Sequence, residues 1–265
     1  MTGRKTGHVV LAGAGPGEAD LITVKLQKKL AEADVIITDR LVNPKIISAN
    51  AKIDALILFA GKQGYNDNSI TQDKINQLII EHAALGETVV RLKGGDVAYF
   101  SNILDELIAL HENNISFEII PGITAASGAS AYAAIPLTAR GYAQGVQFIA
   151  FNPTSDLSHE KWKSLAAATD TLVFYMAAQH LMELTEKLLH YSKKPSTPLA
   201  VIEQATTVHQ RIHITTLQNC VTDFAALSFS SPALVLIGDV VKLHERFNWF
   251  AANNNGSVFS KLETL

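Results

Sequence analysis

The sequence predicts an α/β protein of two domains, each with a sheet covered by helices. Short β-branched runs alternate with longer segments whose apolar residues recur at helical spacing. Glycine-rich turns close several of these runs, and a chain of 265 residues is long enough for two medium-sized cores. Alternation of strands and helices is typical of mostly parallel sheets covered on both faces.

The first half carries five expected strands and three expected helices. The strands are expected at residues 8–12, 35–38, 55–59, 88–92 and 117–120. The helices are expected at residues 21–33, 71–85 and 103–112, where apolar residues follow the helical period. Thr71 is placed to cap the second of these helices and Gly86 to end it.

A second series of elements begins after residue 141. Strands are expected at residues 146–150, 171–175, 199–203 and 233–237, and helices at residues 162–168 and 181–191. Residues 210–215 alternate polar and apolar side chains, which favours an antiparallel strand with one solvated face. The expected domains are therefore residues 1–142 and 143–250, followed by a flexible tail at residues 251–265.

The composition argues against several classes of protein. The net charge is −3, with 48% hydrophobic and 18% charged residues and no strongly basic half, so no nucleic-acid partner is expected. No apolar stretch has the length of a membrane span and no signal peptide is evident, so a cytoplasmic location is expected. Cys220 is the only cysteine, which excludes an intrachain disulfide. The nine histidines show no metal-ligand spacing, so no catalytic metal is expected.

The first glycine-rich turn, G-A-G-P-G at residues 13–17, follows the first expected strand. Glycine permits positive φ and lets a ligand approach the backbone closely. The spacing differs from the dinucleotide-binding pattern, because Pro16 stands where a helix facing a pyrophosphate would begin. By itself, the turn leaves a ligand-binding loop and a purely structural tight turn both open.

Two further loops follow expected strands and carry polar side chains. They are R-L-K-G-G-D at residues 91–96 and P-G-I-T-A-A at residues 121–126. Because ligands of open α/β sheets bind at the carboxyl ends of strands, the three loops are expected to form one rim. Asp96 can accept hydrogen bonds from hydroxyl groups and Thr124 can donate or accept, which suits an adenosyl ligand. Three unrelated turns on a stable sheet are the alternative.

Taken together and in order, the motifs resemble the tetrapyrrole methylase family and, within it, the uroporphyrinogen-III C-methyltransferases. The resemblance covers about residues 8–250 and rests on the combination of motifs, since none of them is specific alone. The segments that carry it are residues 13–17, 20–23, 39–42 (D-R-L-V), 90–96, 121–125, 135–138 with Arg140 and Gly141, 172–176 and 231–234.

The resemblance implies two α/β domains with S-adenosylmethionine (SAM) in the cleft between them, and a homodimer. SAM would be the methyl donor and S-adenosyl-L-homocysteine the product. Ala205 stands where the family usually has glycine. By position, the residues expected to bind SAM are Pro16, Gly94, Gly95, Asp96, Tyr99, Thr124, Ala125, Met176 and Ala205.

The resemblance also implies a reaction, the C-methylation of uroporphyrinogen III to precorrin-2 by two successive methyl transfers, in siroheme or cobalamin biosynthesis. Asp39 falls on the family's proton acceptor and Lys62 on its proton donor. A carboxylate can remove the proton that leaves the macrocycle after methylation. The substrate is rich in carboxylates, which arginine binds in a bidentate manner. The cations expected to bind them are Arg40, Arg91, Lys93 and Arg140.

The chain departs from the family pattern on the substrate side. Asn102 replaces the family's arginine, and residues 103–104 replace a glycine pair, which predicts a helix start with Ser101 as a candidate cap. Ala139 replaces a histidine and Gln63 an arginine. These changes remove cations, so SAM binding is indicated more strongly than uroporphyrinogen specificity. The alternatives are a relative that methylates another precorrin or a non-tetrapyrrole substrate, and a SAM-binding module with weak or no catalysis.

Overall fold

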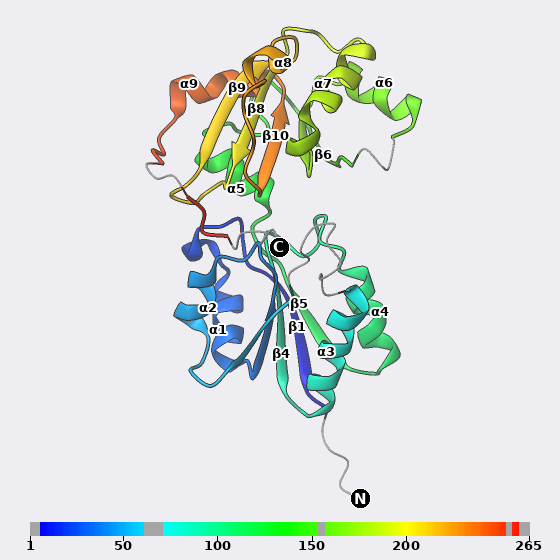
Figure 1. Cartoon of the computed structure of the whole chain (residues 1–265), viewed down its shortest axis with the longest axis vertical. Coiled ribbons are helices and arrows are strands. Elements are labelled where there is room, and N and C mark those ends of the chain that lie inside the picture. Colours follow the sequence, from blue (N-terminus) through cyan, green and yellow to red (C-terminus); the bar gives the residue numbers. More distant parts are fainter. Residues whose placement is uncertain (1–5, 61–70, 153–156, 253–255, 260–265) are drawn as a thin grey trace, which may run out of the picture. The chain divides into compact units, whose positions relative to one another are not determined.

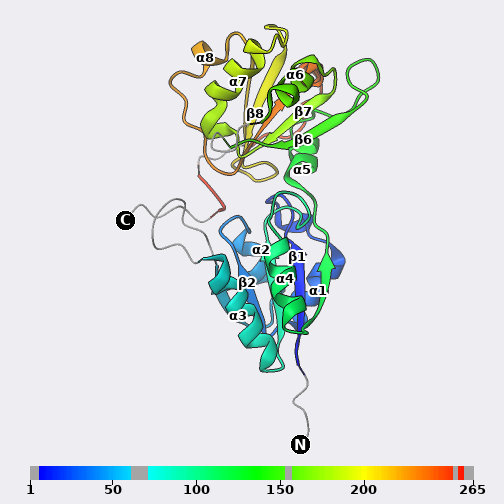
Figure 2. The same ribbon diagram turned by 90° about the vertical axis from the view of Figure 1, so that its right-hand side faces the viewer.

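The structure is a computed structural model that describes residues 6–60, 71–152, 157–252 and 256–259. The chain divides into two compact units, one formed by Met1–Thr124 with Ser257–Leu265 and the other by Ala125–Gly256. Each unit has its own five-stranded sheet with helices packed on it (Figures 1 and 2). The prediction of two α/β domains is therefore confirmed.

The sheet of the first unit is parallel throughout. Its strand order is β3-β2-β4-β1-β5. β-branched and leucine-rich runs form the three central strands, which are buried on both faces, as expected for a covered parallel sheet. The strands are β1 (His8–Gly13), β2 (Val35–Thr38), β3 (Leu56–Phe59), β4 (Thr88–Lys93) and β5 (Ser116–Ile120).

Helices cover both faces of this sheet (Figure 1). Leu26 and Ile46 pack into the core on one face, and Ile75 and Leu110 into the core on the other. The elements are η1 (Ala19–Leu21), α1 (Val24–Glu32) and α2 (Pro44–Asn50), with α3 (Gln72–Ala84) and α4 (Leu104–Glu112) on the opposite face.

Side chains cap the first turn of α1, α2 and α3. Thr71 accepts a hydrogen bond from Lys74 N at 3.3 Å, and Gly86 with φ 92° follows the end of α3, so both predictions there are confirmed. Helix α1 begins later than expected, because Thr23 caps it by accepting from Leu26 N at 3.1 Å. The prediction that Ser101 caps α4 is wrong, since its hydroxyl donates to Val97 O instead.

The second unit has a mixed sheet with the order β6-β7-β10-β8-β9. β6 and β7 are parallel, β10 is antiparallel to both β7 and β8, and β9 is antiparallel to β8. The expected antiparallel strand near residues 210–215 is thereby confirmed. The strands are β6 (Val146–Ala150), β7 (Thr171–Tyr175), β8 (Pro198–Glu203), β9 (Arg211–Thr216) and β10 (Ala233–Ile237).

Two cores flank this second sheet. Trp162 and Leu184 belong to the core on one face, and Ala129 and Val240 to the core on the other. The helices of the first face are α6 (His159–Ala167), η2 (Ala178–His180), α7 (Leu181–His190) and α8 (Cys220–Asp223). Those of the second are α5 (Ala125–Tyr132) and η3 (Asp239–Lys242), and α9 (Leu243–Phe247) follows η3 directly.

The division between the units lies at residues 124 and 125, earlier than the boundary expected between residues 142 and 143. The physical reason is helix α5, whose Ala126 and Ala129 pack against Val173 and Ala200 of the second sheet. A helix of small residues has no pronounced apolar face, so the sequence pattern did not reveal it.

Part of the expected flexible tail is packed. Just before the tail, Phe250 lies edge-on to Tyr132 of α5, with 4.8 Å between ring centroids. Phe259 is buried and belongs to the first unit. Residues 253–255 and 260–265 lie outside the described residues.

A buried carboxylate marks the end of β8. Glu203 accepts two hydrogen bonds from Arg211, at 2.8 and 3.0 Å, one from His213 at 2.7 Å, and one from Ser230 N. Burial raises the pKa of Glu203, but the bonds from Arg211, Ser230 and His213 outweigh it, so the net pKa is lowered. The pKa of Glu203 is thus lower in the folded protein than in the unfolded chain, where it is about 4.3. The ionised carboxylate therefore stabilises the fold above about pH 4.3, and this contribution is lost as the pH falls through the folded pKa.

We therefore expect Glu203→Gln to flatten the acid side of the stability curve. Urea midpoints measured from about pH 6 down to pH 3 should fall more steeply for the unmodified protein than for the variant. Asp34 and Glu118 also have lowered pKa values. The urea midpoint of the variant should therefore still fall with decreasing pH, but less steeply. Parallel curves for the two proteins would show that Glu203 carries none of the acid sensitivity.

Candidate functional site

The candidate site lies at one edge of the first sheet. Because all five strands are parallel, the loops that follow β1, β2, β4 and β5 leave the sheet at its carboxyl edge. Ligands of open α/β sheets bind at this edge. The structure therefore brings together the three glycine-containing loops that the sequence places after strands.

The loops after β1 and β4 are hydrogen-bonded to each other. Gly15 N donates to Gly95 O at 3.0 Å and Gly95 N donates to Gly15 O at 2.8 Å, while Ala14 N donates to Lys93 O at 2.7 Å. Gly15 and Gly95 have φ values of 77° and 70°, which side chains disfavour. Glycine is thus required here for the contact between the two loops, whether or not a ligand also approaches the backbone.

The loop after β5 packs against the same two loops. A Cβ atom at Gly122 would lie 2.2 Å from Gly95 O, and one at Gly13 would lie 2.5 Å from the same oxygen. Asp96 is buried and joins these loops, since its carboxylate accepts from Ala98 N and from Gly122 N, each at 2.7 Å. A carboxylate has further acceptor capacity, so the expected bond from Asp96 to a ligand hydroxyl stays a prediction.

We expect Gly122→Ala to weaken SAM binding by disturbing this junction. The added methyl group would meet backbone atoms of Gly95 and Gly13, which cannot move aside as a flexible side chain would. Calorimetric titration with SAM should show a loss of at least about tenfold in affinity, equivalent to about 1.4 kcal/mol.

Gly7→Ala is the matched control for this variant. Its Cβ would lie 2.0 Å from Glu87 O, a comparable clash at the amino edge of the same sheet. It should lower thermal stability and leave the SAM affinity of the folded protein unchanged. Equal losses of SAM affinity in both variants would trace the effect to general destabilisation and not to the loop junction.

Arg91 and Lys93 do not lie on a surface that a substrate could reach. Both are buried, and both pair with the fully buried Glu106 of α4: Arg91 Nε lies 3.0 Å and Lys93 Nζ 2.7 Å from its carboxylate oxygens. Arg91 also donates to the carbonyls of Ile37 and Leu92, at 3.3 and 3.0 Å. Burial lowers the pKa of Lys93, and Arg91 adds to this, whereas Glu106 and Asp39 oppose it. The structure does not support the expected binding of substrate carboxylates by these two cations, because Glu106 already pairs with both.

Asp39 and Arg40 follow β2 at the same edge and are half-buried. The Asp39 carboxylate accepts a hydrogen bond from Leu41 N at 3.0 Å, which holds it in a tight turn. Burial lowers the pKa of Arg40, and the negative charge of Asp39 opposes this. Lys62, the expected proton donor, lies outside the described residues.

The residues expected to bind SAM fall in both units. In the first unit, Pro16 is buried in the loop after β1, Tyr99 is exposed after Asp96, and Thr124 is partly buried. In the second unit, Ala125 begins α5, Met176 follows β7 and Ala205 follows β8. Their roles toward SAM stay predictions.

Backbone strain marks the edge of the second sheet that carries Met176 and Ala205. β7 and β8 are both antiparallel to β10, so their carboxyl ends share this edge. Met176 is exposed with φ 60°, and the residues on either side of Ala205, Gln204 and Thr206, have φ values of 46° and 70°. Strained non-glycine residues cluster at ligand-binding and active sites, so this edge is a second candidate for function.

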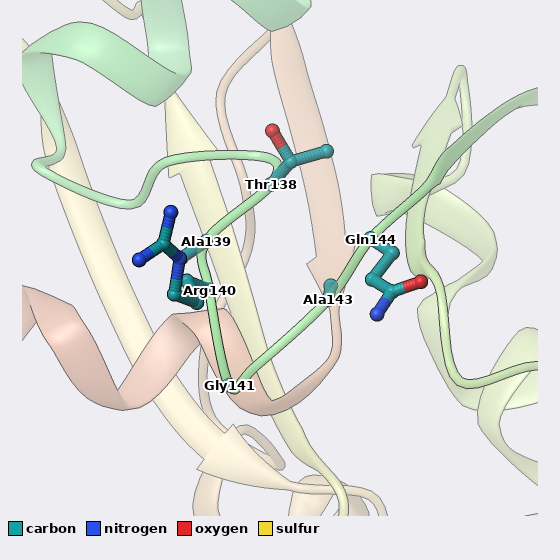
Figure 3. A pocket seen from close by; sticks show the side chains of 6 residues that line it. All are labelled: Thr138, Ala139, Arg140, Gly141, Ala143 and Gln144. Carbon is teal, nitrogen blue, oxygen red and sulfur yellow. The ribbon is translucent and has the colours of Figure 1, made fainter.

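Arg140 lies on an exposed loop of the second unit. A pocket of about 370 Å³ opens at this loop, and Figure 3 shows Arg140 projecting from the turn that ends at Gly141. A bridge between Ala139 and Ala143 holds the base of the loop. Among the described residues Arg140 has no ion-pair partner, so it fits the expected binding of a substrate carboxylate better than Arg91 or Lys93 does.

The described residues also bear on two other kinds of site. No group of three or more histidine, cysteine, aspartate or glutamate side chains is placed to hold a metal ion within those residues. Within the same residues, no helix is both long and apolar enough to cross a membrane.

Glu106 is the site residue that the sequence analysis missed. A signal for it was present, because Glu106 is spaced three residues from Ile103 and four from Leu110, on the side of α4 that packs on the sheet. A carboxylate at such a position must find a cation when buried. The structure supplies two.

Comparisons with known proteins agree on one family. The model of the Tetrapyrrole (Corrin/Porphyrin) Methylases matches residues 8–220. A siroheme synthase of Saccharophagus degradans is 41% identical over 93% of this chain and 53% of that protein, and one of Edwardsiella ictaluri is 44% identical over 92% and 52%. This chain thus spans about half the length of these curated relatives.

Two solved methyltransferase structures are also similar to this chain. A uroporphyrin-III C-methyltransferase from Thermus thermophilus complexed with S-adenosyl homocysteine superposes with a TM-score of 0.75 and 29% identity, over 89% of this chain and all of that one. A cobalt precorrin-4 methyltransferase of cobalamin biosynthesis gives a TM-score of 0.79 and 26% identity, over 88% and 95% of the two chains.

Proposed function

This chain belongs to the tetrapyrrole methylase family and is a SAM-dependent methyltransferase, and from this premise we propose that its substrate is uroporphyrinogen III. The product would be precorrin-2, formed by two successive methyl transfers in siroheme or cobalamin biosynthesis. The observation that carries the proposal is the 41–44% identity to siroheme synthases over more than nine-tenths of the chain.

The chemistry divides between cofactor and protein. SAM supplies a methyl group activated by its sulfonium, so the chain itself has to align the carbon nucleophile and remove a proton. Alignment at near-attack distance is the larger contribution in such transfers. In the proposed reaction a C–C bond forms as the C–S bond breaks, and the displaced proton leaves the macrocycle.

Asp39 is the proposed proton acceptor and Lys62 the proposed proton donor. In support, Asp39 lies at the carboxyl edge of the first sheet, beside the loops that carry most of the proposed SAM contacts. Its turn is fixed by the bond from Leu41 N, so the carboxylate has a defined position. The pairing of a base with a group that returns a proton elsewhere is ordinary acid–base catalysis.

Arg40 and Arg140 are the proposed contacts to the carboxylates of the substrate. Arg140 is exposed on a pocket, and Arg40 lies next to Asp39. The family's arginine at position 102 is absent, and Asn102 instead donates to Asp105 at 2.6 Å in the first turn of α4. The similarity to the cobalt precorrin-4 methyltransferase favours a second candidate, methylation of another precorrin.

We further propose that the protein is a cytoplasmic homodimer. The resemblance to its family supports the dimer, and the composition supports the location. Sedimentation equilibrium would measure the mass directly.

An anaerobic assay with purified protein, SAM and uroporphyrinogen III tests the function. Mass spectrometry of the product should show two added methyl groups. SAM binding without transfer to uroporphyrinogen III would overturn the proposed substrate, and transfer to a precorrin in the same assay would establish the second candidate.

A further inference from the structure

Gln210 is a buried residue whose side-chain amide is hydrogen-bonded at both ends. It lies between β8 and β9, immediately before β9 begins. Its Oε1 accepts a hydrogen bond from Thr206 N at 2.8 Å, and its Nε2 donates to Tyr132 O at 3.2 Å. An N–H group on one side and a carbonyl on the other fix the orientation of the amide. The two partners belong to segments that are far apart in the sequence.

The first partner belongs to the turn after β8 that carries Ala205. Thr206 is buried with φ 70°, which is unusual for a β-branched residue, and Gln204 on the other side of Ala205 has φ 46°. Such backbone persists only where the surrounding structure holds it. Thr207 Oγ1 donates to Gln204 O at 2.8 Å, and Gln210 N donates to Thr207 O at 3.0 Å. Gln210 therefore holds this strained turn through both its backbone and its side chain.

The second partner is the last residue of α5, the helix that begins at Ala125. Carbonyls at the C-terminal end of a helix have no donor within the helix and take one from elsewhere. Tyr132 O takes it from Gln210, and Ala131 O from Trp249 Nε1 at 2.9 Å. Because α5 has only eight residues, it moves as one short rigid element, so a bond that holds its last residue also restricts its first.

We propose that Gln210 is a positioning residue for SAM binding: it ties the turn of Ala205 to helix α5 and so fixes Ala205 relative to Ala125. The inference rests on the proposed function, because it takes both alanines to lie at the SAM site. An alanine can contact a ligand only with its backbone and one methyl group. Its contribution therefore depends on the segments that hold it in place, and Gln210 joins the two segments concerned.

Gln210→Met tests the bridge, because it removes both side-chain hydrogen bonds at nearly constant volume. Trp249→Phe is the matched control at α5. It removes the bond to Ala131 O, keeps an aromatic ring beside Tyr132, and leaves the turn after β8 unchanged.

Thr185→Val is the control for general stability. Thr185 is buried in α7, on the opposite face of the second sheet from α5, and its hydroxyl donates to Met182 O at 2.8 Å. The variant removes one buried hydrogen bond of the same unit without touching either segment that Gln210 joins.

The first measurement is calorimetric titration of each folded variant with SAM. Gln210→Met should lower the affinity by about tenfold, the scale expected for one buried hydrogen-bonding group left without its partner. Trp249→Phe and Thr185→Val should stay within about twofold of the wild type. An unchanged affinity in Gln210→Met overturns the proposal. An equal loss in Trp249→Phe also overturns it, because the effect would then belong to the end of α5 and not to the bridge.

The second measurement uses Gln210→Glu, which also keeps the proposal testable should Gln210→Met fail to fold. A protonated carboxyl group can accept from Thr206 N and donate to Tyr132 O, as the amide does, whereas an ionised one can only accept. Burial raises the pKa of a carboxyl group, so this variant should match the wild-type SAM affinity at about pH 5 and fall below it at about pH 8. A SAM affinity well below that of the wild type at both pH values would overturn the proposal.

The third measurement separates binding from catalysis. In Gln210→Met the KM for SAM should rise by about the same factor as the dissociation constant, with little change in kcat for transfer to uroporphyrinogen III. A lowered kcat at unchanged KM would overturn the proposal. A wild-type protein that binds SAM without methylating uroporphyrinogen III would overturn the proposed substrate, while the titrations with SAM would still decide the role of Gln210.

Discussion

Replacing Glu106 with glutamine is expected to lower the free energy of unfolding by about 3–5 kcal/mol. The change leaves Arg91 and Lys93 buried side by side without a balancing carboxylate. The cost of an unpaired buried charge exceeds any loss of packing, since glutamine has nearly the same shape as glutamate. Urea denaturation followed by circular dichroism would measure the change as a shift of the midpoint at constant slope.

Glu118→Gln is the control for this effect. Glu118 also contacts two lysines, Lys25 and Lys29, but its side chain retains 24% exposure, and solvent screens such pairs. Its loss should cost less than about 1 kcal/mol. If Glu106→Gln were as mild as Glu118→Gln, the buried cluster would not contribute to stability as its geometry indicates.

Replacing Asp39 with asparagine is expected to reduce kcat for methyl transfer by about 10²–10⁴-fold, the range for loss of a general base. Asparagine can still accept the bond from Leu41 N, so the turn after β2 should keep its shape. The affinity for SAM should therefore be unchanged. Steady-state assays together with calorimetric titration of SAM would separate the two quantities.

Asp34→Asn serves as the comparison, because it removes a carboxylate from the amino end of the same strand. It should leave kcat near that of the unmodified protein. Turnover of Asp39→Asn within a few-fold of normal would show that another group removes the proton. A joint loss of SAM affinity and kcat would instead point to a distorted loop.

The strands were the most predictable part of the fold. The runs at residues 35–38, 146–150, 171–175 and 233–237 have the bounds that their β-branched and apolar residues indicated. The strands at residues 35–38, 171–175 and 233–237 are almost fully buried on both faces, and all four are continuous apolar runs that composition identifies. Helix α5 was not predictable in the same way, because alanine, serine and glycine give no clear contrast between a core face and a solvent face.

The site was only partly predictable for a related reason. Glycine spacing indicated which loops meet, since close backbone approach leaves a signature in the sequence. The sequence did not indicate that Arg91 and Lys93 are buried. Glu106, the carboxylate with which both pair, lies more than ten residues further along the chain, so no local pattern connects the three residues. Side chains two residues apart on a strand share a face, so the pair could have been recognised as one cluster but not assigned a partner.

The bonds between the glycine loops also bear on which cofactors this edge can discriminate against. A phosphate group is recognised by backbone N–H groups that point outward from a loop. Here the N–H groups of Ala14, Gly15, Gly95 and Gly122 are all donated to acceptors within the protein. Those four groups are unavailable to a pyrophosphate, so these loops lack, at four positions, the outward N–H groups with which a dinucleotide-binding loop holds its ligand.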